Sequence, residues 1–184
     1  HAPAAEKLQF HARLAPNGFH LPHRLWTFML SDDPTWGDML ADAVANVAVG
    51  SVQTLLNSAV HASVGQMGPW PTTGWTRLLI GHDLVTGKGL LTPEQERRTR
   101  ACLVFLAHVL DHPDYWNPEH GLASGNPNMT NSIRLPKGLF GLYMWGHPLS
   151  GKWLAAAESE VIREIENWVH EGGVATPLVA RWPG

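Results

Sequence analysis

The stretch from Trp116 to Arg134 concentrates side chains that could bind or transform a polar ligand. Its 19 residues include four asparagines, one histidine and one arginine. A connection of this length between two helix-like segments is typical of functional loops. Clustered neutral amides beside an arginine and a histidine suit a polar ligand, most readily an anionic one. The sequence therefore predicts a ligand-binding loop over these residues.

A second group with chemical potential is His108-Val-Leu-Asp111-His112, in which two histidines stand four residues apart on a predicted helix. Both rings then face one side, and this spacing can hold a metal ion. The motif resembles the inverted zinc-peptidase motif, with Asp111 in place of glutamate. A helix end, where His112 favours the C-terminal dipole and Asp111 caps the turn, explains the same residues. No third ligand is evident, so we expect no zinc.

His1 could form an amino-terminal copper site with another histidine, and His11, His20 and His23 are available. Copper oxygenases of that kind are β-sandwiches, whereas the patterns described below are helical. We therefore expect no copper and no other cofactor.

Length and composition define the general class of the chain. Its 184 residues suit one domain with a sizeable core. The net charge of −3 argues against general nucleic-acid binding, which requires a basic face. Nine tryptophans against two tyrosines fit either a Trp-rich core or a groove that stacks sugars. The single cysteine, Cys102, excludes an internal disulfide framework and is expected to be a buried thiol.

The chain begins without a methionine or a signal-peptide pattern and stops soon after a Gly-Gly break, which suggests a piece of a longer protein. Residues 1–35 are interpreted as a loop-rich segment with one short element around Leu25–Leu30. Residues 36–184 are interpreted as a helical domain.

A long helix is predicted from about Trp36 to Val64. The positions that recur at helical spacing are Leu40, Val44, Val47, Ser51, Leu55 and Ala59. Residues 43–76 contain no Asp, Glu, Lys or Arg, which raises the possibility of a membrane span. The amides Asn46, Gln53 and Asn57 interrupt this run, so we expect a buried helix and no membrane span.

The remaining segments are also interpreted as helices and connections. Residues 66–91 are rich in Gly, Pro, Trp and Thr and are expected to form a connection. Thr92-Pro93-Glu94-Gln95 predicts a helix start, with Thr92 as N-cap, and this helix ends before Pro113. A short apolar helix is expected over 135–145.

The final helix is expected over 151–171. Its inward positions are Leu154, Ala157, Val161, Ile165 and Trp168, and its outward positions are Glu158, Glu160, Arg163, Glu164 and Glu166. No segment shows the alternation of a strand, so the fold class is all-α.

One family resemblance rests on Ser124-Gly125-Asn126-Pro127-Asn128-Met129, an apolar helix, Gly146-His147-Pro148 and Trp153-Leu154. Over roughly residues 90–173 the chain resembles the helical domain of the heparinase II/III and alginate lyase group of polysaccharide lyases. The resemblance implies helical hairpins in an incomplete (α/α) toroid that precedes a β-sandwich domain. It also implies a periplasmic or extracellular lyase acting on an acidic polysaccharide. In that group an Asn or His neutralises the uronate carboxylate, and a Tyr or His removes the C5 proton.

Site roles follow from that chemistry. Asn128, with Asn126 and Arg134 nearby, would hold the carboxylate, because elimination builds up negative charge there. His120 is the first candidate for the general base, followed by Tyr143 and His147. Further substrate contacts are assigned to Asn131, Trp116 and Trp145. The asparagines could equally cap helices and hold turns.

Two other functions remain open from the sequence. An (α/α)-barrel glycoside hydrolase needs two carboxylates across a cleft, and few acids lie in the expected loops: Asp83, Asp114 and Glu119. A carbohydrate-binding or scaffold module would stack sugars on Trp70, Trp75, Trp116 and Trp145 without chemistry. The sequon Asn128-Met129-Thr130 is ranked below a binding role for Asn128.

Overall fold

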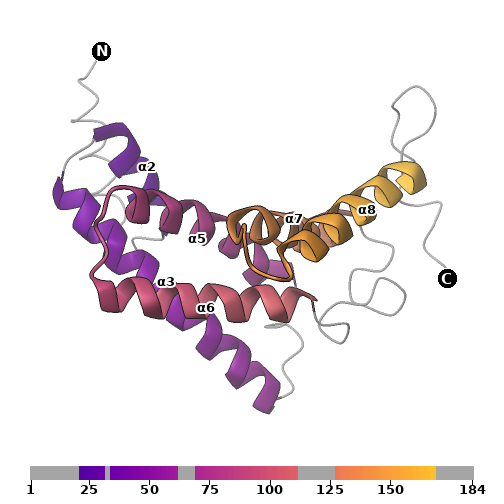
Figure 1. Ribbon diagram of the computed structural model, residues 1–184, viewed down its shortest axis with the longest axis horizontal. Coiled ribbons are helices and arrows are strands. Elements are labelled where there is room, and N and C mark those ends of the chain that lie inside the picture. Colours follow the sequence, from indigo (N-terminus) through magenta and orange to yellow (C-terminus); the bar gives the residue numbers. More distant parts are fainter. Residues whose placement is uncertain (1–20, 32–33, 62–68, 112–126, 169–184) are drawn as a thin grey trace. The chain divides into compact units, whose positions relative to one another are not determined.

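The computed structural model describes residues 21–31, 34–61, 69–111 and 127–168, and the regular elements within them are all α-helices (Figure 1). The helices are α2 (Leu21–Ser31), α3 (Pro34–His61), α5 (Pro69–Gly87), α6 (Pro93–Asp111), α7 (Pro127–Tyr143) and α8 (Ser150–Trp168). No strand occurs in these ranges, so the all-α class is confirmed for the part of the chain that is described.

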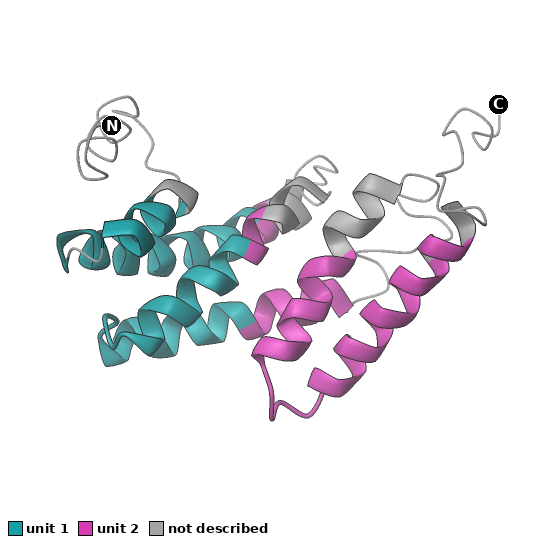
Figure 2. Cartoon of the chain, turned by 90° about the horizontal axis from the view of Figure 1, so that it is seen from above, with its two compact units in different colours: residues 1–54, 77–103 teal, residues 55–76, 104–184 magenta. Residues whose placement is uncertain are grey.

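The chain divides into two compact units (Figure 2). Unit 1 comprises residues 1–54 and 77–103, and unit 2 comprises residues 55–76 and 104–184. Each unit has its own buried apolar side chains. They are described separately below.

In unit 1, helix α2 contributes to the core rather than forming a separate segment. Leu21, Leu25 and Phe28 are buried. The Arg24 side chain of α2 donates a hydrogen bond of 2.8 Å from Nη1 to the carbonyl oxygen of Met39 on α3. The short element expected around Leu25–Leu30 is therefore present, as helix α2.

Helix α5 replaces the connection that was expected over residues 66–91, and that expectation was wrong. Its buried residues recur at helical spacing: Trp75, Leu78, Leu79, His82 and Val85. Pro69 and Pro71 fall in the first turn, where a backbone N–H has no partner within the helix and proline is tolerated. The prolines of this segment thus mark a helix start, and Gly81 allows a close contact, because an added Cβ there would lie 3.0 Å from Cγ2 of Val44.

The predicted start of α6 is confirmed in detail. The Thr92 hydroxyl accepts a hydrogen bond of 3.2 Å from the Gln95 backbone N–H, and the Gln95 side chain accepts one of 2.9 Å from the Thr92 backbone N–H. This reciprocal pair is a capping box, which satisfies two N–H groups that the helix itself cannot. Pro93 occupies the first helical position, as expected.

In unit 2, helices α7 and α8 form a closely packed hairpin. A Cβ atom built on Gly141 of α7 would lie 2.8 Å from the Leu154 backbone nitrogen and 2.9 Å from the Ser150 carbonyl oxygen. The backbones of the two helices therefore approach as closely as glycine permits. The buried side chains of the hairpin include Phe140, Met144, Trp153 and Ala157.

The expected inward face of the last helix is only partly correct. Ala157 is buried, but Val161 and Ile165 are exposed. The close contacts with α7 at Gly138 and Gly141 involve Ser150, Leu154 and Ala157, in the first half of α8.

Helix α3 contains the one segment, among the described residues, that is long and apolar enough to cross a membrane, Pro34–Asn57. Length and composition alone support this, and buried helices of globular proteins meet the same criteria. In unit 1 Leu40, Val44 and Ala48 of this helix are fully buried. Asn46 and Gln53 are exposed along it, as are Asp38 and Asp42.

Candidate functional site

The stretch predicted as a ligand-binding loop is a helix from Pro127 onward, so that part of the loop prediction was wrong. Asn128 and Asn131 fall in the first two turns of α7, and its first turn contains no acidic residue. Residues 116, 120 and 126 lie outside the described ranges. The expected roles of Trp116, His120 and Asn126 therefore stay predictions.

Three further candidate site residues lie at the opposite end of the same helix. Tyr143 is the last residue of α7, and Trp145 and His147 follow in the turn to α8. Fifteen residues separate positions 128 and 143, which corresponds to about 22 Å along a helix that rises 1.5 Å per residue. Apart from Arg134, the candidate residues that the structure describes therefore form two groups, one at each end of α7.

Arg134 connects the two helices of the hairpin. Its side chain is 1% exposed, and its Nε donates a hydrogen bond of 3.1 Å to Oε2 of Glu160 on α8. Lys137 of α7 lies 3.8 Å from the same carboxylate. A guanidinium buried in this way aligns α7 on α8, and a substrate in solution does not reach it. Glu160 was expected to face outward and instead takes part in this network.

A second carboxylate, Asp111 at the end of α6, joins the network from the other side. It accepts a hydrogen bond of 2.7 Å from Lys152 of α8 and lies 3.6 Å from Lys137 Nζ. Burial alone would raise the pKa of Asp111, but the Lys152 hydrogen bond and the charges of both lysines hold this pKa below its ordinary value. Asp111 is thus a fixed anion that ties α6 to α7 and α8.

Three rings meet beside this network. The His147 ring stacks on Trp153, with ring centres 4.9 Å apart, and His108 meets the Trp153 edge at 5.5 Å. The two histidine rings lie 5.6 Å apart. Trp153 is fully buried, whereas His108 is exposed and His147 half-buried. The predicted motif on α6 therefore contributes His108 to an aromatic cluster that also contains His147.

The hydrogen bonding of His147 determines what its ring can do. The Leu149 backbone N–H donates a hydrogen bond of 3.2 Å to Nδ1 of His147. Nδ1 therefore carries the lone pair, and the proton of the neutral ring sits on Nε2. In this arrangement Nε2 donates a hydrogen bond to a ligand. It neither accepts a substrate proton nor coordinates a metal.

The turn that carries His147 is held by its backbone. The His147 N–H bonds the Met144 carbonyl at 2.8 Å, and the Ser150 N–H bonds the His147 carbonyl at 3.0 Å. Gly146 has a φ of 93°, a conformation that side-chain-bearing residues rarely adopt. This turn presents Trp145 with 84% of its surface exposed.

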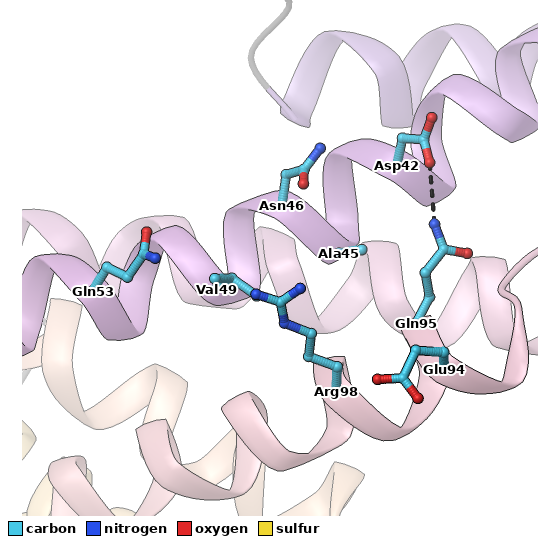
Figure 3. Close-up of a pocket in the computed structure, with 8 residues that line it drawn as sticks. All are labelled: Asp42, Ala45, Asn46, Val49, Gln53, Glu94, Gln95 and Arg98. Atoms are coloured by element: carbon cyan, nitrogen blue, oxygen red, sulfur yellow. Dashed lines mark hydrogen bonds between the residues drawn. The ribbon is translucent and has the colours of Figure 1, made fainter.

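Unit 1 contains a polar groove between α3 and α6 (Figure 3). Its volume is about 340 Å³, and it is lined by Asp42, Ala45, Asn46, Val49, Gln53, Glu94, Gln95 and Arg98. The sequence analysis used Asn46 and Gln53 only to argue against a membrane span. Their spacing from Asp42 along one side of an otherwise apolar helix was the available signal for a groove.

A buried histidine lies elsewhere in unit 1. His82 of α5 is fully buried, with Nε2 3.3 Å from Glu96 Oε2. Glu96 also accepts hydrogen bonds from Thr86 at 3.0 Å and from Arg100 at 2.6 Å. Burial lowers the pKa of His82 below its ordinary value, despite the opposing charge of Glu96. This arrangement connects α5 to α6 and is internal to the unit.

Among the described residues, no group of three or more His, Cys, Asp or Glu side chains is arranged to hold a metal ion. His112, the second histidine of the helical motif, lies outside those ranges. The part of the motif that is described has its own contacts, with Asp111 bound to Lys152 and His108 packed against Trp153.

Comparison of the chain with protein-family models, with curated proteins and with solved structures finds no match.

Proposed function

We propose that this chain is the helical part of a lyase that cleaves uronic-acid-containing polysaccharides by β-elimination. In this reaction a base removes the C5 proton of a uronate and the bond from C4 to the bridging oxygen breaks. A C4–C5 double bond forms, and the released oxygen takes up a proton. Negative charge develops on the uronate carboxylate during proton removal, so donors aimed at that carboxylate lower the barrier.

The observation that carries the proposal is the position of Asn128 and Asn131 in the first two turns of α7. The first backbone N–H groups of a helix have no partner within the helix and attract anions. No acidic residue in the first turn of α7 competes for them. This end of α7 suits a carboxylate.

The general base in this proposal is His120, which precedes Asn128 by eight residues in the sequence. Tyr143 lies about 22 Å further along α7, so it is not the base for a uronate held at Asn128. His147 is also excluded, because its Nδ1 already accepts a backbone hydrogen bond. Trp145 and His147 are assigned instead to sugars several units away from the bond that breaks.

The wider architecture belongs to the same proposal. The described part of the chain is all-α and contains the α7–α8 hairpin, and helical hairpins of this kind are what an incomplete (α/α) toroid requires. An adjoining β-sandwich domain, an acidic-polysaccharide substrate and a periplasmic or extracellular location are proposed on the resemblance in the region of Asn128.

The test is incubation of the chain with alginate, polygalacturonate and glycosaminoglycans, followed by ultraviolet absorbance of the unsaturated uronate. Asn128→Ala should lower turnover by about 10²–10³, the loss typical of one oxyanion-stabilising donor, with an unchanged melting temperature. Asn57→Ala is the matched control. Asn57 is an exposed asparagine of α3 in the same unit with no assigned role, so we expect specific activity and melting temperature to be retained.

Two results would overturn the proposal. One is a chain that produces no unsaturated uronate from any of these polymers. The other is an Asn128→Ala variant that melts early but retains full activity per folded molecule, because Asn128 would then serve only the helix.

A non-catalytic carbohydrate-binding module is the second candidate, and the exposure of Trp145 favours it. A tryptophan held in a firmly bonded turn with 84% of its surface exposed can stack on a sugar ring. Binding of an acidic polysaccharide without any unsaturated product, abolished by Trp145→Ala, would favour this candidate over the lyase.

A further inference from the structure

The polar groove of unit 1 is built from one side of each of two helices. Asp42, Asn46, Val49 and Gln53 follow one another on α3 at intervals of four, three and four residues, so they lie along one side. Glu94, Gln95 and Arg98 face them from the start of α6, as Figure 3 shows. A volume of about 340 Å³ is at the small end of ligand pockets and accommodates a single sugar.

One end of the groove is closed by contacts within the protein. Gln95 Nε2 donates a hydrogen bond of 3.1 Å to Asp42 Oδ1, drawn as the dashed line in Figure 3. The other end of the Gln95 amide belongs to the capping box with Thr92. Glu94 forms an ion pair with Arg97, its neighbour at i+3. Both acids of the groove therefore already have a protein partner.

The rest of the groove carries three polar side chains that have no such contact within the described part of the protein. Asn46, Gln53 and Arg98 have no hydrogen-bond or ion-pair partner among the residues that the structure describes. Figure 3 shows the Arg98 guanidinium reaching from α6 toward Val49 on α3, with Asn46 on one side and Gln53 on the other. One cation and two amides thus line the same groove.

These three groups select a chemical class of ligand. A guanidinium binds a carboxylate through two parallel hydrogen bonds, and side-chain amides both donate to and accept from hydroxyl groups. Ala45 and Val49 supply apolar surface for the C–H face of a small ring. The combination fits a molecule with one carboxylate, several hydroxyls and a compact carbon skeleton.

Other ligand classes fit less well. A divalent anion such as phosphate would carry two charges toward a single arginine while Asp42 and Glu94 stand nearby, which is unfavourable. A metal cation would meet Arg98, and both carboxylates are already engaged. An apolar ligand would bury the guanidinium and two amides without giving them partners, at a cost of several kcal/mol.

We infer that the groove between α3 and α6 binds a hydroxylated monocarboxylate the size of one sugar acid, with Arg98 on the carboxylate and Asn46 and Gln53 on hydroxyls. This site lies within unit 1, whereas the proposed catalytic residues lie in unit 2. The inference therefore stands independently of the proposed lyase activity.

The test is titration of the full chain with D-glucuronate, D-glucose and inorganic phosphate, followed by calorimetry and by NMR of labelled protein. Glucuronate should bind with at least tenfold higher affinity than either glucose or phosphate. Arg98→Gln should weaken glucuronate binding by about 10- to 100-fold, as expected for a lost charged hydrogen-bond pair worth 1.5–3 kcal/mol. Arg98 is exposed, so this variant should fold normally.

Two variants serve as comparisons. Arg77→Gln removes an exposed arginine of α5 in the same unit that does not line the groove, and it should bind as the wild type does. Arg98→Lys keeps the charge but loses the paired geometry, so it should recover only part of the affinity.

Several outcomes would overturn the inference. They are an affinity unchanged by Arg98→Gln, glucose binding as tightly as glucuronate, phosphate binding more tightly than either, or no binding of glucuronate at millimolar concentration. A free monosaccharide has no glycosidic bond at C4 to eliminate, so this binding is measured without the lyase reaction. Chemical-shift changes at Asn46, Gln53 and Arg98 report on the groove, whereas unsaturated uronate formed from a polymer reports on the lyase, so failure of one proposal can be told from failure of the other.

Discussion

Replacement of Gly141 by alanine tests how tightly α7 is held on α8, and thus how firmly the two ends of α7 are positioned. The added Cβ would lie 2.8 Å from the Leu154 nitrogen, 2.9 Å from the Ser150 carbonyl oxygen and 3.1 Å from the Leu154 Cβ. Two of these atoms belong to the backbone of α8, so a side-chain rotation cannot relieve the overlap. The start of α8 must move away from α7.

The magnitude follows from comparison with Gly74→Ala in α5, where an added Cβ would meet nothing within 4 Å. Both changes place alanine inside a helix at a position that belongs to unit 2, and each gains roughly 1 kcal/mol of helix propensity. That gain cancels in the comparison. The remaining difference is the cost of overpacking at Gly141, about 1–3 kcal/mol. Gly138→Ala, whose Cβ would meet only the Ala157 Cβ at 3.2 Å, should fall between the two.

Thermal and urea unfolding of the three variants measure this difference. For a chain of this length, 1 kcal/mol corresponds to roughly 2–4 °C, so Gly141→Ala should melt below Gly74→Ala by roughly 2–12 °C. The ordering Gly74→Ala, Gly138→Ala, Gly141→Ala in decreasing stability is the expected result. If Gly141→Ala is as stable as Gly74→Ala, the close approach of α7 and α8 is not a feature of the folded chain.

Three further predictions concern unit 1. Burial lowers the folded-state pKa of His82. Burial would raise the pKa of Glu96, but the hydrogen bonds from Arg100 and Thr86 hold this pKa below its ordinary value. The unfolded chain therefore binds more protons than the folded chain as the pH falls through about 6.5 and then through about 4.3. The urea concentration at the unfolding midpoint should be lower at pH 5 than at pH 7.5, and this difference should be smaller in His82→Gln. An equal difference in the variant would contradict the assignment of the pH dependence to His82. Burial raises the pKa of the half-buried Cys102 thiol, and the charge of Arg98 partly offsets this rise. The Cys102 thiol should therefore react with iodoacetamide more slowly than a free thiol, and Arg98→Gln should slow this reaction further. Thr92→Ala removes the cap of α6 and should cost about 1 kcal/mol in urea unfolding, whereas a change near zero would show that the capping box contributes no stability.

The parts of the fold that the sequence predicted correctly are those determined by local interactions. The start of α6 required only Thr92, Pro93 and Gln95, whose hydrogen bonds form within one turn of helix. The buried positions Leu40, Val44 and Leu55 of α3 follow a helical period over many residues. Neither inference depends on what packs against the helix.

The two helical segments that were missed have starts rich in residues typical of turns. Pro69, Pro71 and Gly74 in α5, and Pro127 at the start of α7, were each interpreted as part of a connection. Both prolines of α5 fall in its first turn, and Pro127 is the first residue of α7, where proline favours a helix. The buried residues from Trp75 to Val85 show that tertiary packing stabilises α5.

The candidate site could be predicted by residue type but not by arrangement. Arg134 was chosen because an arginine near asparagines suits an anion, but its partner Glu160 stands 26 residues away on α8. Asp42 and Gln95 are 53 residues apart and meet only because α3 and α6 are neighbours. Such pairings depend on helix packing, which the spacing of residues along one helix does not contain.

The length of α7 restricts where the general base of the proposed lyase can come from, which residue types alone could not show. A base and a carboxylate donor must act on adjacent carbons of one uronate, whereas Asn128 and Tyr143 lie about 22 Å apart along α7. The hairpin that separates them is held by Arg134, by Lys137 and by the close approach at Gly141, so bending α7 to unite its ends would break those contacts. If this chain is a lyase, its base must therefore come from near the start of α7, as His120 would, or from outside the described residues. A variant series in which Tyr143→Phe abolished elimination while His120→Ala left it intact would contradict that reasoning, and with it the assignment of Asn128 to the carboxylate.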